Sequence, residues 1–159
     1  MSSSTTDNTT VSPVRSRNMS AIRSKNTRPE MVVRKALHSL GFRYRLHVKD
    51  LAGKPDLVLK KYHLAVFIHG CFWHRHQHCF YTSTPATRKE FWQQKFIQNQ
   101  QRDRLNQQKL LNNGWRVLIV WECGLRSLSP CFNDLVSIIQ STEQLIEWPA
   151  QPYRKSDGL

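Results

Sequence analysis

The sequence predicts a mixed α/β domain, in which a mixed sheet is flanked by helices. Hydrophobic periodicity gives the element order helix, three strands, helix, strand, helix. The apolar run WRVLIVWE at 115–122 is typical of a strand buried on both faces, which indicates the centre of the sheet. The long helix expected before this run is a crossover, so the strands on either side of it are expected to be parallel if they are neighbours.

Length and composition indicate one folded unit. The chain has 159 residues, 39% hydrophobic and 22% charged, which is ordinary for a single globular domain. We expect a disordered leader at 1–14, one domain at 15–150 and a tail at 151–159. No run approaches the roughly 20 apolar residues of a membrane span, and the N-terminus lacks the order of a secretion signal. A cytoplasmic protein without a membrane partner is therefore expected.

The first helices are expected close to the N-terminus. A short basic helix is expected at 16–24. The stretch NTRPE then offers Thr27 as N-cap, Pro29 in the first turn and Glu30 three residues after the cap. A helix should run from there to about Leu40, and Gly41 should end it.

Strand signals follow at 42–46, 56–59 and 64–68, and the short turn at 60–63 predicts a β-hairpin from the last two. After an irregular loop, the TRKE stretch at 87–90 is a second capping-box pattern, which opens a long helix reaching about Asn113 before Gly114. The middle of this helix, QNQQRDR, is almost wholly polar and should face solvent or a ligand. A last helix is expected at 132–147.

The charge balance indicates a polyanionic partner. The chain carries 24 Lys and Arg against 11 Asp and Glu, a net charge of +13. Basic residues interleave with aromatic ones in folded-looking segments, as in RYRLHVKD and TRKEFWQQK, which favours nucleic acid over a membrane surface. A merely solubilising surface is the alternative. Charge fixes the class of partner and not the reaction.

The loop HGCFWHRHQHC has the composition of a metal site. Cys71, His76 and Cys79 offer three zinc ligands within nine residues, and a structural zinc site needs a fourth. Cys123, just after the central strand, is better placed than Cys131. His78 is the alternative to His76, and a cluster of unligated thiols and imidazoles is the alternative to a metal site.

A carboxylate and two imidazoles are expected to share one end of the sheet. Asp56 follows the Pro-containing turn GKP, and the hairpin returns the chain to His69, with His74 on the loop beyond. Alone, Asp56 reads as a turn carboxylate. Together, these groups match phosphodiester hydrolysis, in which magnesium is held by few carboxylates and an imidazole moves the proton.

Aromatic side chains adjoin this loop. Phe72, Trp73 and Trp92 have polar and basic neighbours, and such rings can wedge between base steps of DNA. Burial in the core is the alternative, which we accept for Trp115 and Trp121 on the apolar strand.

At these residues the chain resembles the very short patch repair (Vsr) DNA mismatch endonucleases. The likeness runs through RSRNMSAI at 15–22, GKPD, VFIHGCFWH, PATRKEFW and GWRVLIVWEC, roughly residues 15–126. It implies a restriction-endonuclease-like fold with a structural zinc site. It also implies nicking of one strand 5′ to the T of a T:G mismatch, the lesion left when 5-methylcytosine deaminates.

The resemblance assigns roles to individual residues. It implies Mg²⁺ held by Asp56 and the backbone carbonyl of Ile68, with His74 as general base and His69 assisting. Glu30 matches a glutamate near the active site, although its position also fits a capping box. The resemblance further implies Zn²⁺ held by Cys71, His76, Cys79 and Cys123, and an intercalating wedge of Phe72, Trp73 and Trp92. Generic restriction-type nucleases carry an acidic-x-Lys where this chain has Ile68, His69 and Gly70, so histidine must replace lysine in catalysis.

The expected partner is double-stranded DNA containing a T:G mismatch, bound by a monomer, with mismatch-repair proteins as further candidates. Phosphate contacts are expected from Arg15, Arg17, Arg23, Lys25 and Arg88. Two rivals stay open: a zinc-stabilised DNA-binding module without catalysis, and a nuclease with another mismatch or sequence preference.

Overall fold

The computed structural model describes residues 25–126 and 132–154. The expected leader at 1–14 and basic helix at 16–24 lie outside these residues. The helices are α2 (Arg28–Ser39), α3 (Cys71–His74), α4 (Lys89–Asn112) and α5 (Asn133–Gln140), with 3-10 turns at Lys60–Tyr62 and Glu122–Leu125. The strands are β1 (Arg45–Leu46), β2 (Leu57–Leu59), β3 (Leu64–His69), β4 (Arg116–Trp121) and β5 (Leu145–Trp148). The predicted mixed α/β class is confirmed.

Helix α2 begins and ends as its sequence predicts. Thr27 is the N-cap, and its hydroxyl accepts from the backbone N–H of Glu30 at 3.4 Å. At the other end Gly41 takes a left-handed φ of +91°, and the N–H of Phe42 donates to the carbonyl of Leu37. This is a Schellman closure, which glycine permits because it has no Cβ. It takes residue 42 out of the predicted strand 42–46, of which only Arg45–Leu46 is paired.

The five strands form one mixed sheet in the order β1-β2-β3-β4-β5. β2 and β3 make the predicted antiparallel hairpin, with Leu57 opposite Val66. β3 and β4 are parallel neighbours, with Leu64 opposite Arg116 and His69 opposite Trp121, as the crossover through α4 predicts. This register places the end of β3 beside the end of β4.

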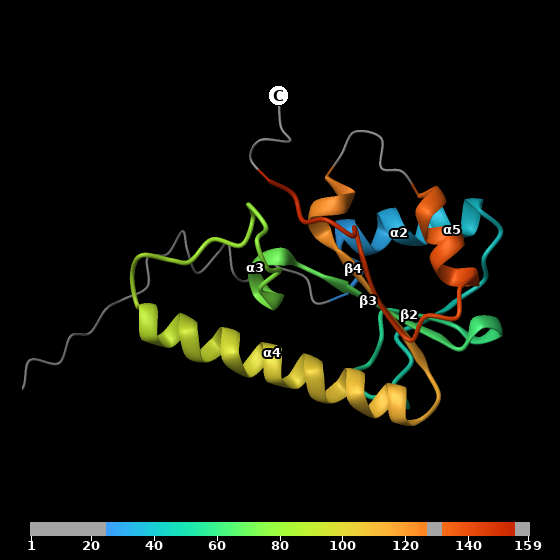
Figure 1. Cartoon of the computed structure of the whole chain (residues 1–159), viewed down its shortest axis with the longest axis horizontal. Coiled ribbons are helices and arrows are strands. Elements are labelled where there is room, and N and C mark those ends of the chain that lie inside the picture. The colour runs from blue at the N-terminus through green and yellow to red at the C-terminus, as the bar shows by residue number, and fades with distance from the viewer. Residues whose placement is uncertain (1–24, 127–131, 155–159) are drawn as a thin grey trace, which may run out of the picture.

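Helices cover both faces of the sheet, so the central strands β3 and β4 contribute to two cores. Figure 1 shows α2 and α5 on one side and the long α4 on the other. On β3, Leu64 and Val66 pack with the α2 and α5 side, whereas Ala65 and Phe67 pack with the α4 side. β4 is buried at every position, which confirms the reading of its apolar run. Among the described residues, no helix combines the length and apolar composition that a bilayer crossing requires.

The predicted last helix at 132–147 is wrong in its second half. Helix α5 ends at Gln140, and Leu145–Trp148 form strand β5, parallel to β4. Ile146 and Trp148 point into the core while Leu145 and Glu147 are exposed, so this short segment alternates as a strand does. The end of α5 is fixed by a distant side chain, because buried Arg116 donates to the carbonyls of Ile138 and Ile139.

The predicted cap of α4 is also wrong, although the helix itself is present. Its N-cap is Arg88, with a left-handed φ of 54°, and within the described part of the chain no side chain caps it. The expected stop is confirmed, since the helix ends at Asn112 and Gly114 has a φ of +81°. The middle of the helix borders the cleft described next, which accounts for its polar composition.

Candidate active site and Cys/His centre

A cleft of about 530 Å³ opens at the edge where β3 ends. Its walls come from the start of α2, the turn before β2, the end of β3, helix α3 and the middle of α4. Lining residues include Glu30, Asp56, Ile68, His69, His74 and Asp103. The structure therefore brings the predicted carboxylate and both imidazoles into one cavity.

Asp56 is held by the neighbouring strand of the hairpin. Its Oδ2 accepts from the backbone N–H of Ile68 at 2.7 Å. Burial raises the pKa of Asp56 to about 6, against the lowering effect of this hydrogen bond, and the nearby Glu30 raises the pKa further. Because ionising a half-buried carboxyl is unfavourable, a cation bound beside it would relieve that penalty.

His69 and His74 form a stacked pair, and His74 also contacts a carboxylate. The two rings lie 3.8 Å apart and nearly parallel, at 8°. His74 Nδ1 contacts Asp103 Oδ2 at 2.6 Å, so the carboxylate fixes Nδ1 as the protonated nitrogen and leaves Nε2 as a base. Burial, and then the nearby His74, lower the pKa of His69.

Sequence reasoning missed Asp103. It lies in the polar run at 98–104, 29 residues from its partner, and local spacing carries no sign of this pairing.

Glu30 has both the capping-box position and the place beside the active site, which the sequence left open as alternatives. Its backbone N–H takes the Thr27 cap, while its carboxylate borders the cleft, 3.0 Å from the guanidinium of Arg34 and 3.0 Å from the N–H of Asn26. Glu30 and Arg34 are 5% and 7% exposed. Among the described residues, the Arg34 Nε is the buried side-chain polar atom without a hydrogen-bond partner.

Replacing Arg34 by alanine is expected to lower the free energy of unfolding by about 3 kcal/mol, because removal of one member of a buried ion pair leaves the other charge uncompensated. Urea unfolding at neutral pH measures the loss. Arg126→Ala is the matched control, since Arg126 and Glu122 form an i, i+4 pair whose side chains are 47% and 32% exposed. That pair should be worth less than about 1 kcal/mol. Equal losses in the two variants would contradict the prediction.

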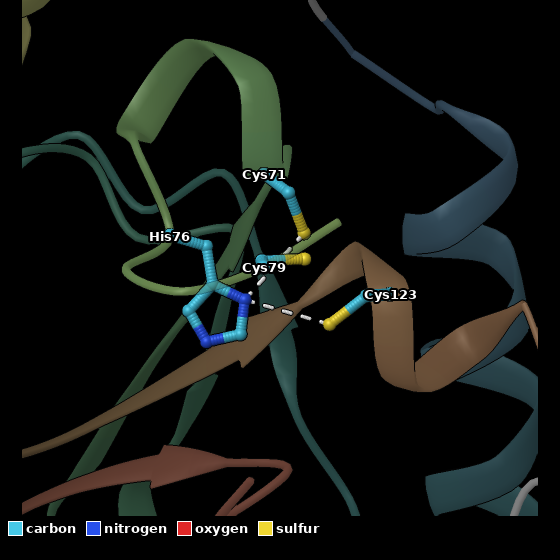
Figure 2. A group of neighbouring side chains, drawn as sticks. All are labelled: Cys71, His76, Cys79 and Cys123. Atoms are coloured by element: carbon cyan, nitrogen blue, oxygen red, sulfur yellow. Dashed lines mark hydrogen bonds between the residues drawn. The ribbon is translucent and has the colours of Figure 1, made fainter. Parts of the chain in front are cut away.

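The predicted cysteine and histidine ligands converge on one point. Figure 2 shows Cys71 at the start of α3, His76 and Cys79 on the following loop, and Cys123 just after β4. Their donor atoms all lie within 4.8 Å of one another, and all four residues are buried. His78 is exposed and outside this group, and Cys131 lies outside the described residues.

The chemistry of this Cys/His centre suits a thiophilic cation. His76 Nδ1 lies 3.7 Å from Cys71 Sγ and 3.5 Å from Cys123 Sγ. Bonds of the length zinc makes to sulfur and nitrogen give tetrahedron edges of roughly 3.3–3.8 Å. A hydrogen bond from the Cys71 thiol lowers the pKa of Cys123 to about 4, against the raising effect of burial and with help from His76. The same hydrogen bond raises the pKa of Cys71.

The predicted wedge residues form one half-buried aromatic cluster between α3 and the start of α4. Phe72 lies 5.1 Å from Trp73 and 5.6 Å from Trp92, centroid to centroid. Sequence reasoning missed Phe96, which is buried beneath them and 5.2 Å from Phe72. Trp73 also lines the cleft, so the cluster adjoins the candidate catalytic groups.

The structure describes two of the residues that are predicted to contact phosphate. Lys25 and Arg88 are exposed, and the Arg88 guanidinium lies 4.4 Å over the Phe91 ring. The other three candidates, Arg15, Arg17 and Arg23, lie outside the described residues.

The chain is similar to one protein family model and to several known proteins. The family model described as DNA mismatch endonuclease Vsr matches residues 6–80. The type II nicking enzyme V.XorIIP of Xanthomonas oryzae pv. oryzae is 48% identical over 110 residues, which cover 69% of this chain and 80% of that enzyme. The DNA mismatch endonuclease Vsr of Escherichia coli is 42% identical over 134 residues, covering 84% of this chain and 82% of that protein. The type II nicking enzyme V.NmeAIP of Neisseria meningitidis is 42% identical over 128 residues, covering 80% and 91%.

Proposed function

The chain belongs to the Vsr family of DNA mismatch endonucleases, enzymes that hydrolyse DNA, and we propose that it nicks one strand 5′ to the T of a T:G mismatch. In this proposal it acts as a monomer through a single domain at 15–150. The observation that carries the proposal is the meeting of Asp56, His69 and His74 in one cleft beside the aromatic cluster.

Two metal ions complete the proposal. Asp56 and the backbone carbonyl of Ile68 would hold Mg²⁺, which when bound supplies charge neutralisation at the scissile phosphate. The raised pKa of Asp56 supports a cation there. The Cys/His centre would hold Zn²⁺ and fix the loop between α3 and α4 to the end of the sheet.

The proton chemistry falls to the histidine pair. His74, oriented by Asp103, takes the proton of the attacking water as general base, because the carboxylate contact at Nδ1 frees Nε2 for that task. His69 is buried and stacked on His74, where it fixes the ring plane and assists the transfer. Glu30, which lines the same cleft and raises the pKa of Asp56, is proposed to order water near Asp56.

Recognition would depend on the aromatic cluster. Phe72, Trp73 and Trp92 are proposed to insert beside the mismatch, where base pairs unstack at less cost than in matched duplex. Arg15, Arg17, Arg23, Lys25 and Arg88 would bind phosphates, so affinity should fall steeply as salt rises. Mismatch-repair proteins are further candidate partners in this proposal.

A nicking assay tests the proposal. Duplexes that carry each mismatch in turn, and a matched duplex, are incubated with the protein with and without magnesium. Magnesium-dependent nicking 5′ to the T of T:G is expected. Binding without nicking under all conditions would favour the rival DNA-binding module, and nicking at another mismatch would favour a nuclease of different preference.

Nicking should also depend on pH through Asp56. Because its pKa is about 6, the carboxyl is protonated below that pH and loses the anionic form that a cation needs. At low magnesium, the single-turnover rate should therefore fall as the pH drops below about 6. Since proton and cation compete for the same oxygens, about a hundredfold more magnesium should move the midpoint by more than one pH unit towards acid. A midpoint independent of magnesium would argue that another group controls the loss.

A further inference from the structure

A series of ring contacts joins the Cys/His centre to the histidine pair. The His76 ring stacks on the Trp121 indole at a centroid distance of 4.2 Å and an angle of 4°. The indole meets the His69 ring edge-on at 5.3 Å and 74°. His69 in turn stacks on His74 at 3.8 Å. Trp121 is thus the described ring that touches both the centre and the pair.

The sheet register places this indole between the two sites. Trp121 is the parallel partner of His69 across β3 and β4, so their side chains leave the sheet on the same face. The indole is 6% exposed, and its Nε1–H donates to Glu147 Oε2 at 3.2 Å, which fixes the ring's rotation. Residues of two strands, β4 and β5, therefore hold the Trp121 indole in a single orientation.

The same rings border a second cavity. Its volume is about 350 Å³, and His69, His74, His76 and Trp121 all line it. Removing the indole would join new space to this cavity and take from His69 its edge-on contact with Trp121. A buried ring that loses its neighbour gains rotational freedom, and a misplacement of about 1 Å at a catalytic group can cost on the order of a hundredfold in rate.

We propose that Trp121 is a positioning residue, which transmits the fixed geometry of the metal-holding Cys/His centre through His69 to the general base His74. The inference rests on the proposed function of that pair. The inference gives the Cys/His centre a second role besides fixing the loop. A bound metal makes His76 rigid, and this rigidity also sets the orientation of the His74 imidazole at the scissile phosphate. Trp121 itself does not line the candidate catalytic cleft.

The experiment compares Trp121→Leu and Trp121→Phe with Trp115→Leu. Trp115 immediately precedes β4, packs on His63 at 5.3 Å and lines neither cavity, so it serves as the control for loss of an indole elsewhere in the fold. Three quantities are measured on the full chain: kcat and KM for nicking a T:G duplex, bound zinc by elemental analysis, and the NMR signal of the His74 Nδ1 proton bonded to Asp103.

For Trp121→Leu we expect kcat to fall about 10- to 100-fold, with KM within about threefold of wild type and one zinc ion retained per chain. The His74 proton signal should broaden in this variant and stay sharp in Trp115→Leu. Trp121→Phe, which keeps a ring between the sites, should recover most of kcat and the sharp signal. It also decides the question if the leucine variant does not fold.

Equal kcat values in Trp121→Leu and Trp115→Leu would overturn the inference. So would loss of zinc from Trp121→Leu, because the indole would then act on metal retention and not on the histidine pair. If the wild-type chain nicks no duplex, the proposed function fails. The NMR comparison, which needs no DNA, still tests the positioning role in that case.

Discussion

Replacing Asp56 by asparagine is expected to lower the single-turnover nicking rate by about a thousandfold or more, while affinity for the mismatched duplex changes by less than about tenfold. A metal-held phosphate contributes several kcal/mol of transition-state stabilisation, and each 1.4 kcal/mol corresponds to a factor of ten in rate. The amide keeps the contact with the Ile68 N–H but lacks the charge that holds a cation. In the proposed mode of binding, affinity depends mainly on phosphate contacts and the aromatic cluster, which the substitution leaves in place.

The measurement is single-turnover nicking beside a gel-shift titration at fixed salt. Asp50→Asn is the matched control, since Asp50 is an exposed carboxylate in the segment that leads to β2. It should nick at the wild-type rate. If Asp56→Asn also nicks at that rate, Asp56 is not a ligand of the catalytic cation and the proposed site is wrong.

The same variant should be more stable than the wild type above pH 6. The folded pKa of Asp56 is raised above its unfolded value of 3.8, so its favourable contribution is complete below about pH 3.8 and is lost as pH rises through about 6. Near pH 7.5 the ionised carboxyl therefore destabilises the fold by an amount on the order of 2–3 kcal/mol. Opposite changes in stability and activity are typical of a group kept for function.

Elements with local signals could be predicted from the sequence. Thr27 and Pro29 define the start of α2 within one turn, and Gly41 marks its end. The apolar run of β4 identifies a strand buried on both faces without knowledge of its partners. In each case the sequence signal lies within or directly beside the residues that form the element.

Elements that depend on distant partners could not be predicted. Nothing near Gln140 ends α5 as strongly as the guanidinium of Arg116, which is more than twenty residues away. Leu145–Trp148 becomes a strand because the free edge of β4 accepts it, and four residues are too few to show a clear period. The TRKE pattern misleads in the opposite way, because Arg88 adopts a left-handed conformation and displaces Thr87 from the cap.

The residues of the candidate site also fall into two groups: those that the local sequence brings together and those that meet only in the folded chain. Asp56, His69 and His74 could be grouped from sequence because one short hairpin joins them. Asp103 could not, since it meets His74 only after α4 has packed on the sheet. His76 stands out from His78 only in three dimensions, where one ring is buried against Trp121 and the other is exposed.

Removing the metal from the Cys/His centre is expected to cost about 5 kcal/mol or more in the free energy of unfolding, comparable to the whole stability of many small domains. The loop from residue 75 to residue 88 contains no helix or strand, and the centre ties it to the end of β4. Without a cation, weaker hydrogen bonds among the four buried side chains would replace the metal–ligand bonds that tie the loop to the end of β4. Thermal unfolding after chelation should show a much lower Tm, which rises with free zinc as linkage requires.

A pair of histidine variants separates the metal site from general packing. His76→Ala should reproduce most of the loss seen on chelation and make the Tm insensitive to added zinc, because it removes the ligand whose Nδ1 lies 3.5 Å from Cys123 Sγ. His78→Ala should change the free energy of unfolding by less than about 0.5 kcal/mol, since an exposed side chain away from any buried partner contributes little. A Tm that ignores chelation, or equal losses in the two variants, would mean that packed thiols and not a bound cation hold the loop.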